Sequence, residues 1–347
     1  MKILVSDVET AHGNACKAII EAECPTATVI MRLESLAASV VYAIPNGYDI
    51  ISRSTTGLSD SRNENEGDTA WTGGQIDSAF SSAFSSAFGG GSIQVGIVHA
   101  LGSNSHVRDL DPSRLDIISA ISGGDGAGNC ASSYGLGLEY FYDNETAQSY
   151  ATARISGIIG QIMINHPNWN FHDARQALRQ TASNYASGWI EDGGYGYVDK
   201  ADATALSSLD LSSPIRKEYT LSDGLIEFAW ISNPQTDFSN TVIAMFETEP
   251  TRSTVPTSAQ IIYAGALEEF EYQFAFNQAK WIAFYTRNSG LDYSLVENNP
   301  DASYWFDKIE LNLVFQSKDV SCEFTDINDI TCELTDINNI SATFTEV

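Results

Sequence analysis

The chain has 347 residues, 43% of them hydrophobic, and a formal charge of −27 from 45 acidic and 18 basic residues. This length suits one large domain and one smaller domain, each able to bury a core. So acidic a chain argues against a nucleic-acid partner, because phosphates attract Lys and Arg. No apolar run is long enough to span a membrane, so no membrane partner is expected either.

The first domain, residues 1–207, is expected to be an α/β domain. Its strand-like and helix-like segments alternate, which predicts a parallel sheet with helices on both faces. Strands are expected at Ile3–Ser6, Thr28–Arg32, Asp49–Ser52 and Ile93–His99, and helices at Gly13–Glu23, Glu34–Ile44, Gln75–Phe88 and Tyr150–Asn165.

Residues 208–319 have a different pattern. Short runs rich in aromatic and β-branched residues alternate with Asn, Pro, Asp, Ser and Gly, which predicts an antiparallel β-sandwich. The clearest runs are Leu225–Ile231, Thr241–Phe246, Gln260–Ala264, Phe270–Phe276, Trp281–Thr286 and Ile309–Phe315.

The tail, residues 320–347, is a tandem repeat with a period of ten residues. Ser321–Ile330 recurs as Thr331–Ile340, so Cys322 and Cys332 occupy equivalent places. These two thiols could stack, form a disulfide or stay free. A repeat this short cannot bury its apolar side alone. We therefore expect a β tail that packs on the preceding domain or on its own copies in a homo-oligomer or larger assembly.

The five cysteines do not suggest a disulfide framework or a metal site. Their odd number leaves at least one thiol unpaired, and no Cys-x-x-Cys spacing occurs. No cofactor is therefore expected from them. The chain begins with Met-Lys-Ile-Leu-Val-Ser-Asp, a strand-like run without an apolar signal core. We expect either that the chain is not exported by the signal-peptide route or that this is a mature form.

One stretch carries the strongest functional pattern. Gln148–Gly157 reads Gln-Ser-Tyr-Ala-Thr-Ala-Arg-Ile-Ser-Gly, and His166–Trp169 and Tyr195–Asp199 follow it. This stretch resembles the serine-bearing end of subtilisin-like serine proteases (subtilases), where Gly-Thr-Ser-Met-Ala-Thr-Pro presents the nucleophile at the start of a helix. The resemblance extends over about residues 1–205. It implies a subtilisin-like fold with Ser149 at the nucleophile position.

The other two members of a subtilase triad have counterparts near the N-terminus. His12–Ile20 reads His-Gly-Asn-Ala-Cys-Lys-Ala-Ile-Ile and resembles the family's His-Gly-Thr-His-Val-Ala-Gly-Ile-Ile at a helix start. Asp7 closes the strand Ile3–Ser6, as the family's catalytic Asp does. The resemblance thus implies Asp7, His12 and Ser149 as the triad, in the family's chain order. Asp7 could instead serve only to end the strand or cap the helix, and Ser149 only to cap a helix.

The resemblance also implies the surroundings of the triad. After the strand Ile93–His99 the family carries an oxyanion-binding Asn behind a Gly; here Ser103 follows Gly102 directly and Asn104 comes one residue later, so either could act. The substrate-binding strand corresponds to Ser54, Thr55, Thr56 and Gly57. The acidic loop Asp60–Asp68 could bind calcium, as many subtilases do.

The serine turn departs from the family pattern, so two functions stay open. Ala147-Gln148 stands where the family has Gly-Thr, and Ala153-Arg154 where it has Pro-His. The leading hypothesis is a serine endopeptidase acting on a polypeptide substrate. The alternative is a catalytically impaired structural or binding protein that keeps the subtilase fold. The β-domain and repeat tail favour an extracellular or virus-particle location over a cytoplasmic one.

Overall fold

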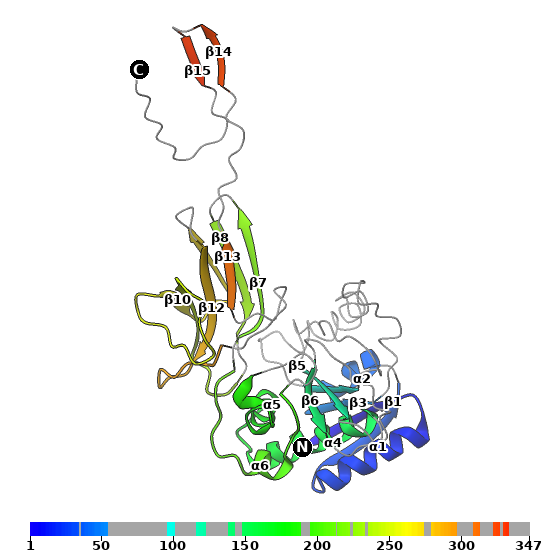
Figure 1. Cartoon of the computed structure of the whole chain (residues 1–347). Helices are drawn as coiled ribbons and strands as arrows, with labels where there is room; N and C mark the ends of the chain where they lie inside the picture. Colours follow the sequence, from blue (N-terminus) through cyan, green and yellow to red (C-terminus); the bar gives the residue numbers. More distant parts are fainter. Residues whose placement is uncertain are drawn as a thin grey trace.

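The protein forms an α/β part, two antiparallel sheets and a separate hairpin (Figure 1). This architecture is seen in a computed structural model. The residues that the structure describes are 1–34, 36–54, 96–100, 116–122, 138–142, 148–188, 195–212, 214–222, 225–232, 235–273, 279–296, 308–312, 322–326 and 329–332.

The α/β part is built on a six-stranded sheet in the order β2-β1-β3-β4-β5-β6, and every neighbouring pair is parallel. The direction of strand addition reverses between β1 and β3, which makes a topological switch point. The four predicted strands appear as β1 to β4, with 93–95 outside the described residues. The strands are β1 (Lys2–Asp7), β2 (Thr28–Leu33), β3 (Ile50–Arg53), β4 (Gly96–Ala100), β5 (Asp116–Ser122) and β6 (Leu138–Tyr142).

Helices cover both faces of this sheet, as the sequence predicts. Side chains alternate along a strand, so Ile3 and Val5 of β1 enter the main core with α1, α4 and α5. Ser6 faces the other way, and its hydroxyl accepts a hydrogen bond from Ser39 of α2 at 2.8 Å. The helices are α1 (Thr10–Glu23), α2 (Leu36–Ala43), α4 (Gln148–Asn165), α5 (Phe171–Thr181) and α6 (Lys200–Ala205), with a short 3₁₀ turn at Tyr185–Ser187.

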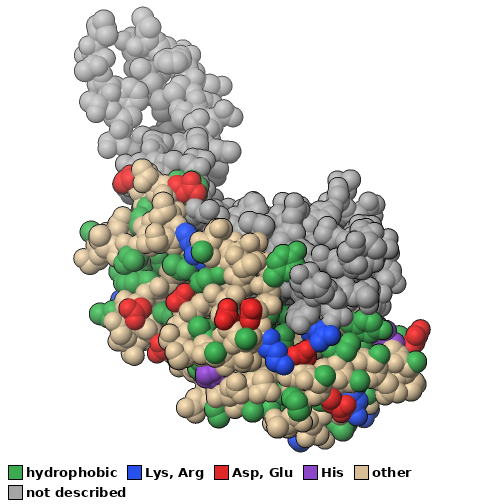
Figure 2. Space-filling model, turned by 60° about the horizontal axis from the view of Figure 1, so that its bottom comes forward, with side chains coloured by type: hydrophobic (Ala, Val, Ile, Leu, Met, Phe, Trp, Pro, Cys, Tyr) green, Lys and Arg blue, Asp and Glu red, His purple; other side chains and the backbone are tan. Residues whose placement is uncertain are grey.

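The predicted helix Gln75–Phe88 lies outside the described residues. Of the helices that the structure does describe, none has the length and apolarity needed to cross a bilayer. On the face shown in Figure 2, acidic and basic side chains are interspersed among uncharged ones, as on an ordinary solvated surface.

The antiparallel part consists of the sheets β10-β9-β12-β13 and β11-β8-β7. Both sheets contribute to one core: Phe228 and Trp230 of β8 pack with Ile243 of β9 and Phe284 of β12. The antiparallel strands predicted from the sequence are therefore present, although 274–276 and 313–315 of the predicted runs lie outside the described residues. They are β7 (Ile215–Ser222), β8 (Leu225–Ile231), β9 (Asn240–Phe246), β10 (Ile261–Gly265), β11 (Glu269–Gln273), β12 (Ala279–Arg287) and β13 (Lys308–Asn312).

The tail contributes a two-stranded antiparallel sheet of its own, β14 (Cys322–Asp326) with β15 (Asp329–Cys332). The register sets Cys322 opposite Cys332, so the equivalent positions of two successive repeats face each other across the hairpin. The rest of the repeat, from residue 333 on, lies outside the described residues.

Candidate active site

The carboxyl edge of the parallel sheet, beside the switch point, holds the three residues predicted as a triad. Asp7 ends β1, His12 lies in α1, and Ser149 bonds to Ser54 just after β3. β1 and β3 are neighbours that end at Asp7 and Arg53, and α1 begins three residues after β1. Ligand sites of open α/β sheets lie outside the carboxyl ends of the strands at such a point. The fold alone therefore marks this edge as the candidate site.

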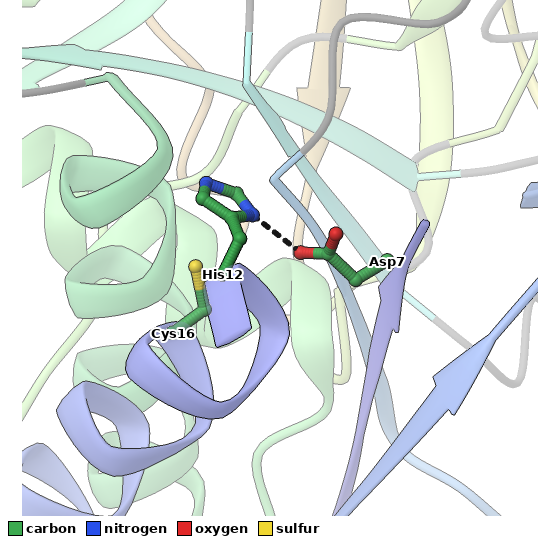
Figure 3. Close-up of side chains that lie close together, drawn as sticks. All are labelled: Asp7, His12 and Cys16. Carbon is green, nitrogen blue, oxygen red and sulfur yellow. Dashed lines mark hydrogen bonds and ion pairs between the residues drawn. The ribbon is translucent and has the colours of Figure 1, made fainter. Parts of the chain in front are cut away.

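Asp7 is fully buried and held in one orientation. Its Oδ1 accepts hydrogen bonds from the backbone N–H groups of Val8 at 2.7 Å and Glu9 at 3.0 Å. Its Oδ2 lies 2.7 Å from Nδ1 of His12 (Figure 3). The carboxylate thus faces the imidazole at hydrogen-bonding distance, with its other oxygen already satisfied.

His12 lies in the first turn of α1, and its side chain is 26% exposed. Because Nδ1 faces Asp7, Nε2 lies on the far side of the ring, away from the carboxylate (Figure 3). The ring stacks beside Tyr150 at 6.3 Å between centroids. Gly13 allows the first turn of α1 to lie close to β1 and β2, because a Cβ there would lie 2.5 Å from Sδ of Met31 and 3.0 Å from Cβ of Asp7.

Ser149 is the second residue of α4 and lies beside the end of β3. Its hydroxyl donates to the carbonyl oxygen of Ser54 at 2.7 Å, and the Ser54 hydroxyl donates back to the Ser149 carbonyl oxygen at 3.2 Å. The single hydroxyl proton of Ser149 is therefore directed at a backbone carbonyl and not at His12. Ser54, predicted to bind substrate, is buried and occupied by this reciprocal pair.

Cys16 was not predicted as a site residue. It lies between Ser149 on one side and the Asp7–His12 pair on the other. It lies one helical turn after His12, on the same face of α1. Its Sγ is 4.0 Å from the Ser149 carbonyl oxygen and within 4.8 Å of ligand atoms of Asp7 and His12. Burial raises the pKa of this thiol, which makes it a poor nucleophile. The i, i+4 spacing from His12 was the signal that could have revealed it.

Arg53 was not predicted either. It lies at the end of β3, and its buried side chain holds Ser6 and Glu34 in place next to Asp7. Its side chain is 3% exposed, and Nη1 donates to Ser6 Oγ and to the Glu34 carbonyl oxygen, both at 2.9 Å. Burial lowers the pKa of the guanidinium, and the negative charge of Asp7 opposes that shift. A lone Arg at the end of an apolar strand was the only sequence signal.

The departure at Ala153-Arg154 has a structural explanation. Arg154 donates from Nη1 to Oε1 of Glu23 at 2.5 Å, and Lys200 donates to Oε2 of the same carboxylate at 2.6 Å. Glu23 ends α1, Arg154 lies in α4 and Lys200 begins α6, so one buried carboxylate ties three helices together.

Several predicted site residues lie outside the described residues. They are the oxyanion candidates Asn104 and Ser103, the substrate-strand residues Thr55, Thr56 and Gly57, and the acidic loop Asp60–Asp68. Their roles stay predictions. Among the described residues, the one group of three potential metal ligands is Asp7, His12 and Cys16.

Comparison with solved structures finds distant, partial likenesses to proteases of the subtilase type. The structure of MycP1 with its N-terminal propeptide removed matches with a TM-score of 0.42 and 15% identity, over 60% of this chain and 91% of that one. The MycP3 protease of the type VII (ESX-3) secretion system matches with 0.42 and 14%, over 60% and 83%. The subtilase cytotoxin SubAB matches with 0.41 and 14%, over 59% and 88%. No protein-family model and no curated protein matches the sequence.

Proposed function

We propose that the chain is a serine hydrolase that cleaves peptide bonds through Asp7, His12 and Ser149. The observation that supports this most directly is the buried Asp7 carboxylate, 2.7 Å from Nδ1 of a partly exposed imidazole at the switch point of the sheet. A carboxylate in this place selects the imidazole tautomer whose Nε2 is free to accept a proton.

In the proposed reaction, Ser149 Oγ attacks the carbonyl carbon of the scissile peptide while its proton passes to His12 Nε2. Asp7 stabilises the imidazolium that results. The imidazolium then protonates the leaving amine, and water releases the acyl group by the same steps in reverse. Asn104 or Ser103, with backbone N–H groups, would bind the oxyanion. The polypeptide would lie along the segment from Ser54 to Gly57.

The reaction requires the Ser149 hydroxyl to leave the Ser54 carbonyl. We expect this to be a change of one side-chain torsion between staggered wells. A polypeptide bound along the segment from Ser54 to Gly57 would favour this rotation, because it would compete for the Ser54 carbonyl.

The alternative function, a catalytically impaired structural or binding protein, is favoured by that same hydrogen bond. The Ser149–Ser54 pair joins α4 to the end of β3 without any part in catalysis. The altered turn at Ala147-Gln148 agrees with it. In this case the fold would serve as a scaffold in an extracellular or virus-like assembly.

Labelling with a fluorophosphonate separates the two functions. We expect the wild type to be labelled at Ser149 and Ser149→Ala to lose the label. Ser156→Ala is the matched control, because Ser156 is a buried serine of the same helix whose hydroxyl donates to the Thr152 carbonyl. No labelling of the wild type under conditions that label ordinary subtilases would support the scaffold. Labelling that persists in Ser149→Ala would place the nucleophile elsewhere.

A further inference from the structure

We infer that Asp7, His12 and Cys16 form a binding site for one thiophilic divalent cation of the Zn²⁺ class. Each residue offers one ligand atom, and the three atoms lie within 4.8 Å of one another. They come from the end of β1 and from two successive turns of α1 (Figure 3). In the sequence, only the i, i+4 spacing of His12 and Cys16 points to this set, because Asp7 joins it from a different element.

The distances suit a tetrahedral ion after small adjustments. Zinc binds N and O ligands at about 2.0–2.2 Å and sulfur at about 2.3 Å, so its ligands lie roughly 3.3–3.8 Å apart. Asp7 Oδ2 and His12 Nδ1, now 2.7 Å apart, would separate by about half an ångström to admit the ion. Cys16 Sγ would approach by about 1 Å through a change of its side-chain torsion. Water takes the fourth position on the exposed side of His12.

The ligand chemistry selects the class of ion. A thiolate with an imidazole favours soft or borderline cations over Mg²⁺ and Ca²⁺, which prefer oxygen ligands alone. The Asp7 carboxylate and the Cys16 thiolate together supply two negative charges, so a divalent ion is neutralised where it is buried. That balance matters because both side chains are fully buried.

Binding would change the protonation of the site in a defined way. The Cys16 thiol loses one proton to solvent as the S–metal bond forms. The ion takes the lone pair of Nδ1, so the single imidazole proton moves to Nε2. A protonated Nε2 cannot accept the Ser149 proton. The ion would therefore switch the site off, a consequence that rests on the proposed function, whereas the binding itself does not.

Calorimetric titration of the tag-free, reduced full chain with Zn²⁺ tests the binding. Ca²⁺ and Mg²⁺ are added in excess, so that they and not Zn²⁺ occupy the surface carboxylates. The wild type should bind one more tight ion than Cys16→Ala or Cys16→Ser, release about one proton with it, and unfold at a higher temperature in its presence. Cd²⁺ should give a thiolate charge-transfer absorbance that both variants lose. We expect the affinity of this site to fall at least about tenfold in either variant.

Cys24→Ala is the matched control. Cys24 follows the same helix, is equally buried, and burial raises the pKa of its thiol too. This variant should bind Zn²⁺ like the wild type. Binding that is unchanged in both Cys16 variants, or lost in Cys24→Ala, would overturn the site. Cys16→Ser keeps the size of the side chain, and circular dichroism would establish that it folds.

Fluorophosphonate labelling with and without Zn²⁺ separates the two proposals. If both hold, Zn²⁺ blocks labelling of the wild type and leaves Cys16→Ser labelled. Binding that depends on Cys16 in a chain that is never labelled would keep the metal site and reject the hydrolase. Labelling of Ser149 in a chain whose Zn²⁺ binding does not depend on Cys16 would keep the hydrolase and reject the metal site.

Discussion

At the scale of single residues, the orientation of His12 depends on one carboxylate. Asp7 uses one oxygen for two backbone N–H groups and the other for the imidazole. An Asn in its place would keep the oxygen toward the backbone and turn its NH₂ group toward Nδ1. Nδ1 would then have to accept, which moves the imidazole proton to Nε2, the wrong side for a base.

We therefore predict that Asp7→Asn lowers the rate of fluorophosphonate labelling by about 10⁴-fold with little change in fold. The second-order rate constant of labelling, with circular dichroism beside it, checks this. Asp49→Asn is the control: Asp49 accepts from the Lys2 backbone N–H at the opposite end of β1. A rate within about tenfold of the wild type would leave Asp7 a purely structural role.

Residues of the site differ in how far the sequence could reveal them. Asp7, His12 and Ser149 were predicted because each sits in a short motif that resembles one of the subtilase family, at a strand end or a helix start. Arg53 and Ser54 act through contacts with Ser6 and Ser149, 47 and 95 positions away along the chain. No local pattern encodes such a partner.

At the scale of elements, α1 and α4 are in close contact beneath the site. A Cβ at Gly157 of α4 would lie 2.5 Å from Cβ of Glu23 and 3.2 Å from the Ile20 carbonyl oxygen of α1. These are rigid atoms of a helix. A Cβ at Gly160 would lie 2.9 Å from Cδ1 of Ile3, the movable tip of a side chain.

We predict that Gly157→Ala lowers the free energy of unfolding by about 1–3 kcal/mol, since the two helices would have to separate. Gly160→Ala should cost less, because Ile3 can turn away and Ala gains up to about 1 kcal/mol of helix propensity over Gly. Urea unfolding of both variants gives the comparison. Equal effects of the two substitutions would contradict the close contact at Gly157.

The predicted elements agree with the structure where the apolar pattern is strong. β8, predicted at Leu225–Ile231, has the same bounds in the structure, because its buried Ile226, Phe228 and Trp230 alternate with exposed residues. β7 was not predicted. It is the edge strand of its sheet, and its Arg, Lys and Glu residues interrupt the apolar pattern. Charged residues on edge strands discourage unwanted pairing. The same charged residues interrupt the alternation of apolar residues, so the sequence pattern did not predict this strand.

At the scale of the whole molecule, one buried acid joins the α/β part to the antiparallel sheets. Asp173 accepts from the Asn170 N–H at 2.8 Å, within the capping box of α5, and from the Thr236 N–H at 3.2 Å. Gln235 adds bonds to Asp210 and Ser212. Burial raises the pKa of Asp173 above its usual 3.8, and the bonds to Asn170 and Thr236 oppose that shift.

A raised pKa means that the folded protein binds the Asp173 proton more tightly than the unfolded chain. The stability that this supplies is complete below pH 3.8 and is lost as the pH rises through the folded pKa. We therefore predict that the free energy of unfolding of the wild type falls relative to that of Asp173→Asn as the pH rises over this window. Urea unfolding of both proteins at several pH values measures the difference. A pH-independent difference, or one of opposite slope, would contradict the prediction.

The tail poses a problem of incomplete pairing. β14 and β15 pair with each other in a sheet of two strands, and an isolated two-stranded hairpin is marginally stable at best. Within the part of the tail that the structure describes, neither strand pairs with a third, so each has an outer edge that can accept another strand. The repeat supplies suitable partners, because every copy carries the same spacing of apolar residues.

We therefore predict that the tail assembles with the tails of other copies, and that deleting residues 320–347 lowers the particle mass measured by light scattering. Added strands would pair the open edges and bury the apolar side that one repeat leaves exposed. The truncated chain should keep its circular dichroism and its labelling by fluorophosphonate, because the site lies in the α/β part. A truncated protein with the same particle mass as the full chain would show that the tail is an appendage and that any association uses another surface.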